Sequence, residues 1–253
     1  MTRPPDPSPR VVRLIIAYDG TGYVGWQRQE TGESIQGLIE GALAKIDGGA
    51  VTLHGAGRTD AGVHALGQVA SASMTASLDD RTLGRALNAN LPPEIRILDV
   101  ATVADDFHAR FSATTKTYEY RIWNAPVVRP FVRLYTWHVP QPLDMVRLQE
   151  ASAAIPGEHD FAAFQGSGGV THTTVRRILS AGWRADGEAL IFDIRGEGFL
   201  RHMVRSLVGT LVEIGHGRRG VDDLARLLRA PARADAGRTA PAHGLFLVRV
   251  DYG

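Results

Sequence analysis

The chain has 253 residues, of which 44% are hydrophobic and 22% are charged, and its formal net charge is +1. This length and balance predict a globular protein of one or two domains with a substantial core. The chain has no cysteine, which excludes disulfides, a thiolate nucleophile and cysteine-ligated zinc or iron–sulfur sites. The nine histidines show no HExxH spacing that would supply two metal ligands from one helix. We therefore expect a reaction that needs neither a metal nor a cofactor.

The first ten residues, MTRPPDPSPR, are rich in Pro and Arg and have no apolar centre, so they do not resemble a secretory signal. No later stretch is apolar enough to span a membrane. We expect a cytoplasmic protein without a membrane partner, and a disordered tail over residues 1–10.

The first half of the chain alternates strand and helix patterns. β-Branched and aromatic residues from Val11 to Asp19 predict a buried strand. Ser34 is a typical N-cap, and the apolar residues that follow it recur at helical spacing. The order is β-α-β-β-α-β, with a strand over 11–19, a helix after Ser34, strands over 51–54 and 66–74, a helix over 80–91 and a strand over 95–103.

Gly20 to Gly25 fit G-x-G-x-x-G directly after a strand, which is the spacing of a dinucleotide-binding loop. That loop requires a helix that begins inside the glycine run, so that the helix N-terminus meets the pyrophosphate. Residues 26–32 show no helical apolar period. We therefore reject a dinucleotide site here.

The stretch from Gly55 to Gln68, GAGRTDAGVHALGQ, places small residues around one charged pair. Three glycines and two alanines surround Arg58 and Asp60, so the backbone can adopt positive φ and a substrate can approach closely. An Asp in such a turn often does no more than cap it. The composition of the turn alone leaves both a structural and a catalytic role open.

The second half of the chain repeats the order of the first. It is predicted to contain a strand over 117–123, a helix over 143–155, strands over 173–184 and 189–196, helices over 200–214 and 221–228, and a strand over 245–252. We expect an α+β fold of two ferredoxin-like β-α-β-β-α-β halves, over residues 11–110 and 111–253. The halves could join into one mixed, largely antiparallel sheet, with helices on one face and a catalytic cleft between the halves.

Basic residues gather in two parts of the sequence. His108 to Arg133 contain five Lys or Arg residues against one Glu, and Arg195 to Arg219 contain five Arg against two Glu. Such segregation allows local positive surfaces, which a phosphate backbone requires, on a nearly neutral protein. Two solvated faces without a nucleic-acid partner would give the same pattern.

The run GAGRTDAGVHALGQVA resembles the signature of the tRNA pseudouridine synthases of the A type. Other stretches are similar to further motifs of that family, and they are YDGTGYVGWQRQ from Tyr18, TKTYEY from Thr115, GFLRHMVR from Gly198 and GRTAPAHGL from Gly237. The residues His159-Asp160-Phe161 and Phe164 also resemble a family pattern, although we expect them to serve packing. The resemblance covers nearly the whole chain and implies the same two-half architecture.

The resemblance implies an enzyme that converts uridine to pseudouridine at tRNA positions 38, 39 and 40, on the 3′ side of the anticodon stem-loop. It makes Asp60 the catalytic nucleophile, places Tyr118 and Leu245 against the target base, and pairs Arg205 with the catalytic Asp. Tyr118 would also help to remove the C5 proton. Because the target base must leave its stack, Arg58 is the candidate to fill the vacated space and hold phosphates. The family works as a homodimer without metal or cofactor.

Simpler explanations exist for the same residues. Tyr118 and Tyr120 would face one core from a strand, Arg205 would lie on a helix surface, and Leu245 would begin a core strand. Two other functions also remain open, namely a catalytically silent RNA-binding or chaperone protein and a hydrolase of N-glycosidic bonds. The sequence also leaves open whether the carboxylate attacks the sugar or removes its 2′ proton.

Overall fold

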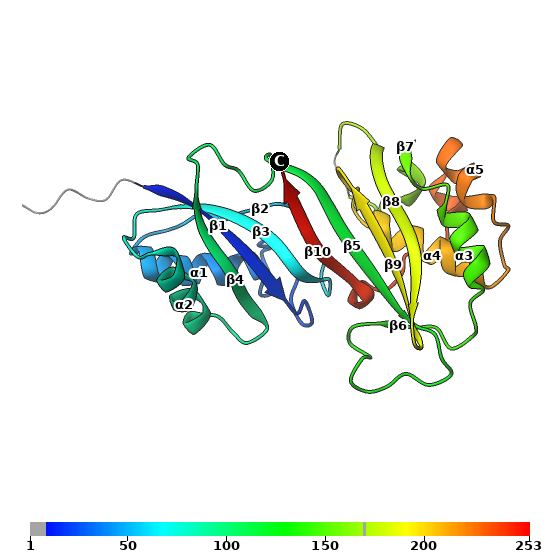
Figure 1. Cartoon of the computed structure of the whole chain (residues 1–253), viewed down its shortest axis with the longest axis horizontal. Helices are drawn as coiled ribbons and strands as arrows, with labels where there is room; N and C mark the ends of the chain where they lie inside the picture. Colours follow the sequence, from blue (N-terminus) through cyan, green and yellow to red (C-terminus); the bar gives the residue numbers. More distant parts are fainter. Residues whose placement is uncertain (1–8, 169–170) are drawn as a thin grey trace, which may run out of the picture. The chain divides into compact units, whose positions relative to one another are not determined.

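The computed structural model describes residues 9–168 and 171–253, which form two compact units (Figure 1). Unit 1 consists of the described residues up to Thr114 together with Leu247–Gly253, and unit 2 consists of the described residues of Thr115–Phe246. Residues 1–8, which make up most of the expected tail, lie outside the described part. Within the described ranges, no helix has the length and hydrophobicity that a membrane crossing requires.

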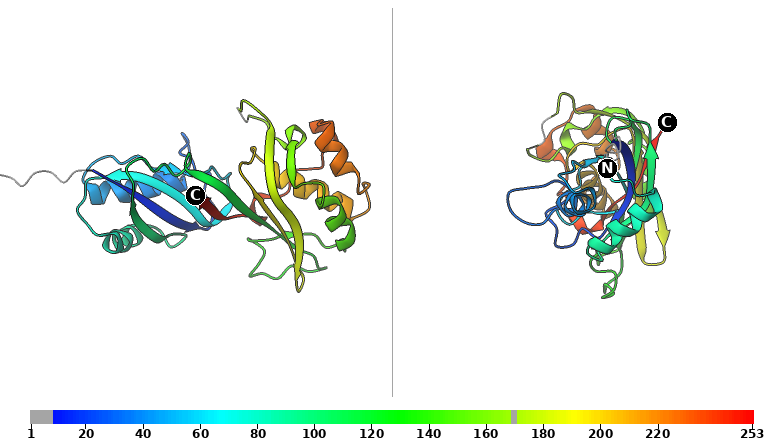
Figure 2. Two further views of the ribbon diagram at one scale, coloured as in Figure 1. Left: turned by 45° about the horizontal axis from the view of Figure 1, so that its top comes forward. Right: turned by 90° about the vertical axis from the view of Figure 1, so that its left-hand side faces the viewer.

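Unit 1 is an antiparallel sheet with two helices on one face (Figures 1 and 2). Its elements are β1 (Arg10–Tyr18), α1 (Ile35–Asp47), β2 (His54–Gly55), β3 (His64–Met74), α2 (Asp80–Asn90), β4 (Ile95–Val103) and the part of β10 (Leu245–Tyr252) from Leu247 onward. The strands lie in the order β4-β1-β3, with β2 on β3, and β10 is another neighbour of β3. This is the strand order of a ferredoxin-like unit.

Alternation along β1 explains why the sheet of unit 1 has one face in the core. Val12, Leu14, Ile16 and Tyr18 are buried, whereas the residues between them are half-buried. On the helix side, Ser34 caps α1 by accepting a hydrogen bond from Gly37 N, as its position in the sequence predicted.

Unit 2 packs its helices on one face of a second sheet (Figure 2, left). Its elements are β5 (Ala113–Trp123), which enters from unit 1, β6 (Trp137–His138), α3 (Met145–Ser152), β7 (Gly157–Asp160), β8 (Val175–Asp186), β9 (Ala189–Gly196), α4 (Met203–Gly215), α5 (Asp223–Arg229) and 3₁₀ turns at Ala162–Phe164, Arg233–Asp235 and Ala242–Gly244. The strands run antiparallel in the order β5-β9-β8-β7, and β6 pairs with β5 in parallel. Helix α4 is buried along most of its length and is the centre of this unit.

The α+β class and the largely antiparallel pairing are confirmed, and the bounds of β4, β9 and β10 coincide with the predicted strands. The loop between β1 and α1 contains Gly20 to Gly25, and no helix begins within that run, as the lack of a helical period over residues 26–32 predicted. Phe161 and Phe164 are fully buried, as expected for packing residues. Two short strands, β6 and β7, were not predicted because neither has a periodic pattern of its own.

The predicted strand over 51–54 is wrong in all but its last residue. Val51 and Leu53 are buried as a strand would require, but side chains take the backbone hydrogen bonds of Leu53. The carboxylate of Glu40 accepts from Leu53 N at 3.0 Å, and Gln36 Nε2 donates to Leu53 O at 3.0 Å. Polar side chains of α1 therefore replace the ladder that the hydrophobic pattern had suggested.

Candidate active site

The segment between β2 and β3 holds Asp60 in a tight turn of unit 1. Val63 N donates to Asp60 O at 3.1 Å, which closes the turn, and Asp60 itself is half-buried. Arg58, two residues earlier, is exposed. The turn thus holds the backbone of Asp60, and part of the residue remains exposed to solvent.

Gly25 lets the loop after β1 lie directly against the Asp60 turn. Its φ is +106°, and a Cβ on Gly25 would lie 2.6 Å from Thr59 O and 3.0 Å from Ala61 N. The neighbouring Trp26 N donates to Thr59 O at 3.0 Å. In the sequence, this glycine run was tested as a dinucleotide site and matched to a motif of the family, but neither use gave Gly25 a structural role. Its structural role is to carry the backbone that supports Asp60.

A buried pair of hydroxyl groups supports the same turn from beneath. Tyr18 Oη lies 2.8 Å from Thr59 Oγ1, and both side chains are buried. Burial raises the pKa of Tyr18, so its hydroxyl stays protonated at neutral pH and can donate. Gln68 Nε2 donates to Gly57 O at 2.9 Å. These contacts hold residues 57 and 59 on either side of Arg58.

We expect Tyr18→Phe to lower the free energy of unfolding by about 1–3 kcal/mol, because Thr59 Oγ1 loses its buried partner. Turnover should fall as well, since Thr59 precedes Asp60. Tyr252→Phe is the matched control, because Tyr252 Oη donates to Ala109 O at 2.7 Å in the same unit. Urea unfolding and kcat are measured on both variants. An equal change in kcat for Tyr18→Phe and Tyr252→Phe would contradict a specific effect of Tyr18 on the Asp60 turn.

His64 is a residue that sequence reasoning missed. It is 1% exposed, and its Nδ1 lies 3.0 Å from Gly20 N and 3.1 Å from Asp19 Oδ1. It therefore ties the end of the Asp60 segment to the end of β1. Its place in the run GVHAL was the available signal, but a buried histidine is not distinguishable there from a surface one.

Tyr118 is placed in unit 2 by β5. Its side chain is 7% exposed and its ring meets Phe199 edge-on, with 5.0 Å between the centroids. Tyr120, two residues on, is fully buried, and burial raises its pKa. Its hydroxyl donates to Pro241 O at 2.8 Å. Both tyrosines are thus packed residues, and Tyr120 also anchors the loop before β10.

Arg205 lies in the first turn of α4 and is half-buried, not a surface residue. Its Nε donates to Ala240 O at 2.8 Å, and Ala240 N donates to Arg205 O at 3.0 Å. Leu245, the first residue of β10, is 7% exposed. A Cβ on Gly244 would lie 2.7 Å from the ring of Tyr120, so this loop approaches β5 closely.

The predicted site residues therefore fall into two groups, each with its own supports. Unit 1 contributes Arg58 and Asp60, and unit 2 contributes Tyr118, Arg205 and Leu245. Among the described residues, no group of three His, Asp or Glu side chains has an arrangement that could bind a metal ion. The chemistry available is that of a carboxylate, a phenol and guanidinium groups.

A family model described as tRNA pseudouridine synthase matches residues 14–112 and 151–253, which include every one of these residues except Tyr118. This chain belongs to the tRNA pseudouridine synthase family. The synthase is 47% identical to "tRNA pseudouridine synthase A" of Syntrophotalea carbinolica over 242 residues, which cover 96% of both chains. It is also 47% identical over 243 residues to the protein of the same name from Geotalea uraniireducens, covering 96% of this chain and all of the other.

Among solved structures, a chain of a Cbf5–Nop10–Gar1 complex is similar to the synthase at 11% identity and a TM-score of 0.35. The alignment covers 79% of the synthase and 45% of the chain in that complex. The function follows from the two relatives named above, which match the synthase over nearly their full length. The synthase is an isomerase that converts uridine in tRNA to pseudouridine. The resemblance found in the motifs is confirmed.

Proposed function

We propose that this synthase acts on uridines at tRNA positions 38, 39 and 40, in the anticodon stem-loop, with Asp60 as the nucleophile. The names of the relatives agree with this specificity. The assignment of the nucleophile rests on the position of Asp60. It lies on a turn that packs against the backbone of Gly25 through Thr59, and it is two residues from the exposed Arg58. The exposed guanidinium of Arg58 suits a polyanionic substrate.

The reaction requires only a rearrangement of the nucleotide. The N1–C1′ bond breaks, the uracil turns, and C5 bonds to C1′; C5 then loses a proton while N1 gains one. We assign the first step to Asp60, either as attack on C1′ or as removal of the 2′ proton. Tyr118 would stack on the base and assist loss of the C5 proton. Arg205 would supply the positive charge that pairs with the catalytic carboxylate.

The target base must be flipped out of its stack, at a cost of a few kcal/mol. We assign Arg58 to the space that the base leaves and to the neighbouring phosphates, and Leu245 to the apolar surface under the base. A stem-loop of this kind is read mainly through shape, phosphates and 2′-hydroxyls. We further propose that the synthase works as a homodimer in the cytoplasm, where its tRNA substrate is found.

Tritium release from C5-labelled uridine tests the specificity. The substrates are unmodified tRNA transcripts with uridine at position 38, 39 or 40, and a matched transcript with cytidine at all three positions. We expect release only from the first set, without free uracil. Release from the cytidine control would contradict the positions, and free uracil would favour the glycosidic hydrolase. Light scattering on the same protein tests the dimer.

We expect Arg58→Ala to weaken tRNA binding and to reduce the slope of log K against log salt concentration by about 1, the loss of one phosphate contact. Arg85→Ala is the matched control, because Arg85 is an exposed arginine on α2 in the same unit. Filter binding across a salt series measures both slopes. Equal slopes for the two variants would remove Arg58 from the binding surface.

A further inference from the structure

The loop that precedes β10 lies backbone against backbone on α4. A Cβ on Gly209 of α4 would lie 1.7 Å from Arg238 O, and a Cβ on Gly237 of the loop would lie 2.8 Å from Thr210 Cα. Neither position has room for a side chain. The loop over residues 237–241, here called the 237–241 loop, is therefore fitted to one stretch of α4.

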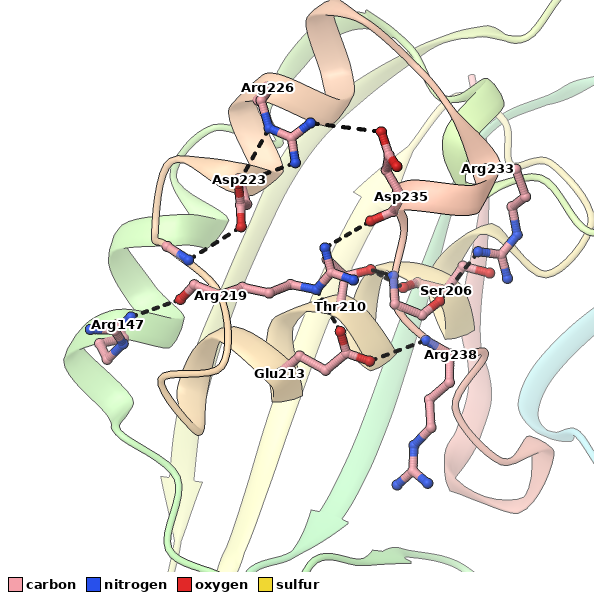
Figure 3. Close-up of polar contacts among 12 residues, drawn as sticks. Arg147, Ser206, Thr210, Glu213, Arg219, Asp223, Arg226, Arg233, Asp235 and Arg238 are labelled. Carbon is pink, nitrogen blue, oxygen red and sulfur yellow. Dashed lines mark hydrogen bonds and ion pairs between the residues drawn. The ribbon is translucent and has the colours of Figure 1, made fainter.

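Side chains of α4 hold this loop by its backbone amides (Figure 3). Thr210 is fully buried; its Oγ1 accepts from Gly237 N at 2.9 Å and donates to Ser206 O at 2.9 Å. One turn further on, Glu213 Oε1 accepts from Arg238 N at 3.4 Å. The other carboxylate oxygen of Glu213 pairs with Arg219 Nε at 2.5 Å. The loop amides thus find their acceptors on the helix.

The same loop contacts Arg205, which we place at the reaction, and Tyr120, which lies two residues after Tyr118 on β5. Ala240 exchanges two hydrogen bonds with Arg205, at 2.8 and 3.0 Å, and Pro241 O accepts from the buried hydroxyl of Tyr120 at 2.8 Å. Leu245 follows four residues after Pro241. Any shift of the loop on α4 would therefore move the carbonyl that aims the Arg205 guanidinium.

We propose that Thr210 is a positioning residue, which aims Arg205 by fixing the 237–241 loop on α4. The proposal rests on the roles given to Arg205 and Leu245 above. Thr210 is five residues beyond Arg205 on the same helix, so one rigid element sets both the arginine and the loop that orients it. Glu213 assists from the next turn through Arg238 N.

The test compares Thr210→Val with Thr210→Ser. Valine keeps the shape of threonine but leaves Gly237 N without its buried acceptor, whereas serine keeps the hydroxyl. We expect Thr210→Val to lower kcat by about tenfold or more, because small misplacement of a reacting group is costly. The Kd for tRNA should stay within about twofold, and Thr210→Ser should restore most of kcat.

Ser152→Ala is the matched control. Ser152 Oγ accepts from Trp183 Nε1 at 2.9 Å, a buried hydrogen bond in the same unit that does not involve the loop. It should lower the unfolding temperature about as much as Thr210→Val while leaving kcat unchanged. Should Thr210→Val fail to fold, Glu213→Ala serves instead, since its side chain is 24% exposed, and it should lower kcat in the same way.

Arg205→Ala, alone and combined with Thr210→Val, tests the role of Arg205 in the reaction separately from its positioning by Thr210. If Thr210 acts through Arg205, the double variant should have the kcat of Arg205→Ala alone. A full kcat for Arg205→Ala overturns the role of Arg205 and the positioning proposal with it. A low kcat for Arg205→Ala, with Thr210→Val no slower than Ser152→Ala, overturns only the positioning of Arg205 by Thr210. If the losses of kcat in the double variant are additive, the positioning of Arg205 by Thr210 is also overturned.

Discussion

Replacement of Asp60 by asparagine is expected to lower the rate of pseudouridine formation by about 10⁴-fold or more, which corresponds to roughly 5.5 kcal/mol of activation free energy. Asparagine keeps the size of the side chain, and the closing hydrogen bond of the turn uses the backbone oxygen of residue 60. The turn should therefore persist and tRNA should bind with near-normal affinity. The substitution removes only the negative charge, to which we assign the attack on the sugar or its deprotonation.

Single-turnover tritium release and filter binding measure the two quantities separately. Asp99→Asn is the matched control, because Asp99 is an exposed carboxylate of unit 1 that pairs with Arg13. It should keep the wild-type rate. If Asp60→Asn retained more than about a tenth of the rate, a difference of only ~1.4 kcal/mol, Asp60 would not be the nucleophile.

Gly25→Ala is expected to reduce kcat by about 100-fold, although Gly25 lies far from Asp60 in sequence. The added Cβ would lie 2.6 Å from Thr59 O, so the Asp60 turn must move away from the β1 loop. Displacement of a reacting group by about 1 Å costs on the order of 10²-fold in rate. Backbone strain at φ +106° adds about 1–3 kcal/mol of destabilisation.

Gly22→Ala separates strain from displacement. Gly22 also has a positive φ, +82°, but no atom lies within 4 Å of the position of its Cβ. It should lose stability and keep most of kcat. Thermal unfolding and steady-state kinetics on both variants provide the comparison. Equal losses of kcat would mean that the close contact at Gly25 does not place Asp60.

Helices and strands with a clear period of apolar residues were predictable from the sequence. Features that depend on the conformation or contacts of single residues were not. β4 and β10 were predicted to the residue because their apolar residues stand between clear turn signals. The start of α4 was placed at Leu200, but His202 has a φ of +62° and the helix begins at Met203. Such an interruption is a property of the backbone in three dimensions, and no pattern of hydrophobicity records it.

In the candidate site, the motif residues were predictable from the sequence and the contacts that support them were not. Asp60, Arg58 and the other motif residues were predicted because short stretches carry them. Their supports were not, because Tyr18 reaches Thr59 across 41 positions and Tyr120 reaches Pro241 across 121. Hydrogen bonds of such sequence separation leave no local signal, so only the folded chain shows which residues hold the turn and the loop.

Unit 1 contains residues from two distant parts of the chain, since β10 lies beside β3 and its residues from Leu247 onward belong to that unit. On the ribosome, β3 is therefore made long before β10, and the part of its edge that β2 does not pair must stay open while all of unit 2 is synthesised. Open strand edges recruit other strands and promote aggregation. The synthase thus acquires its final strand pairing late, and a chain that stops before residue 245 should be prone to aggregate during its own translation.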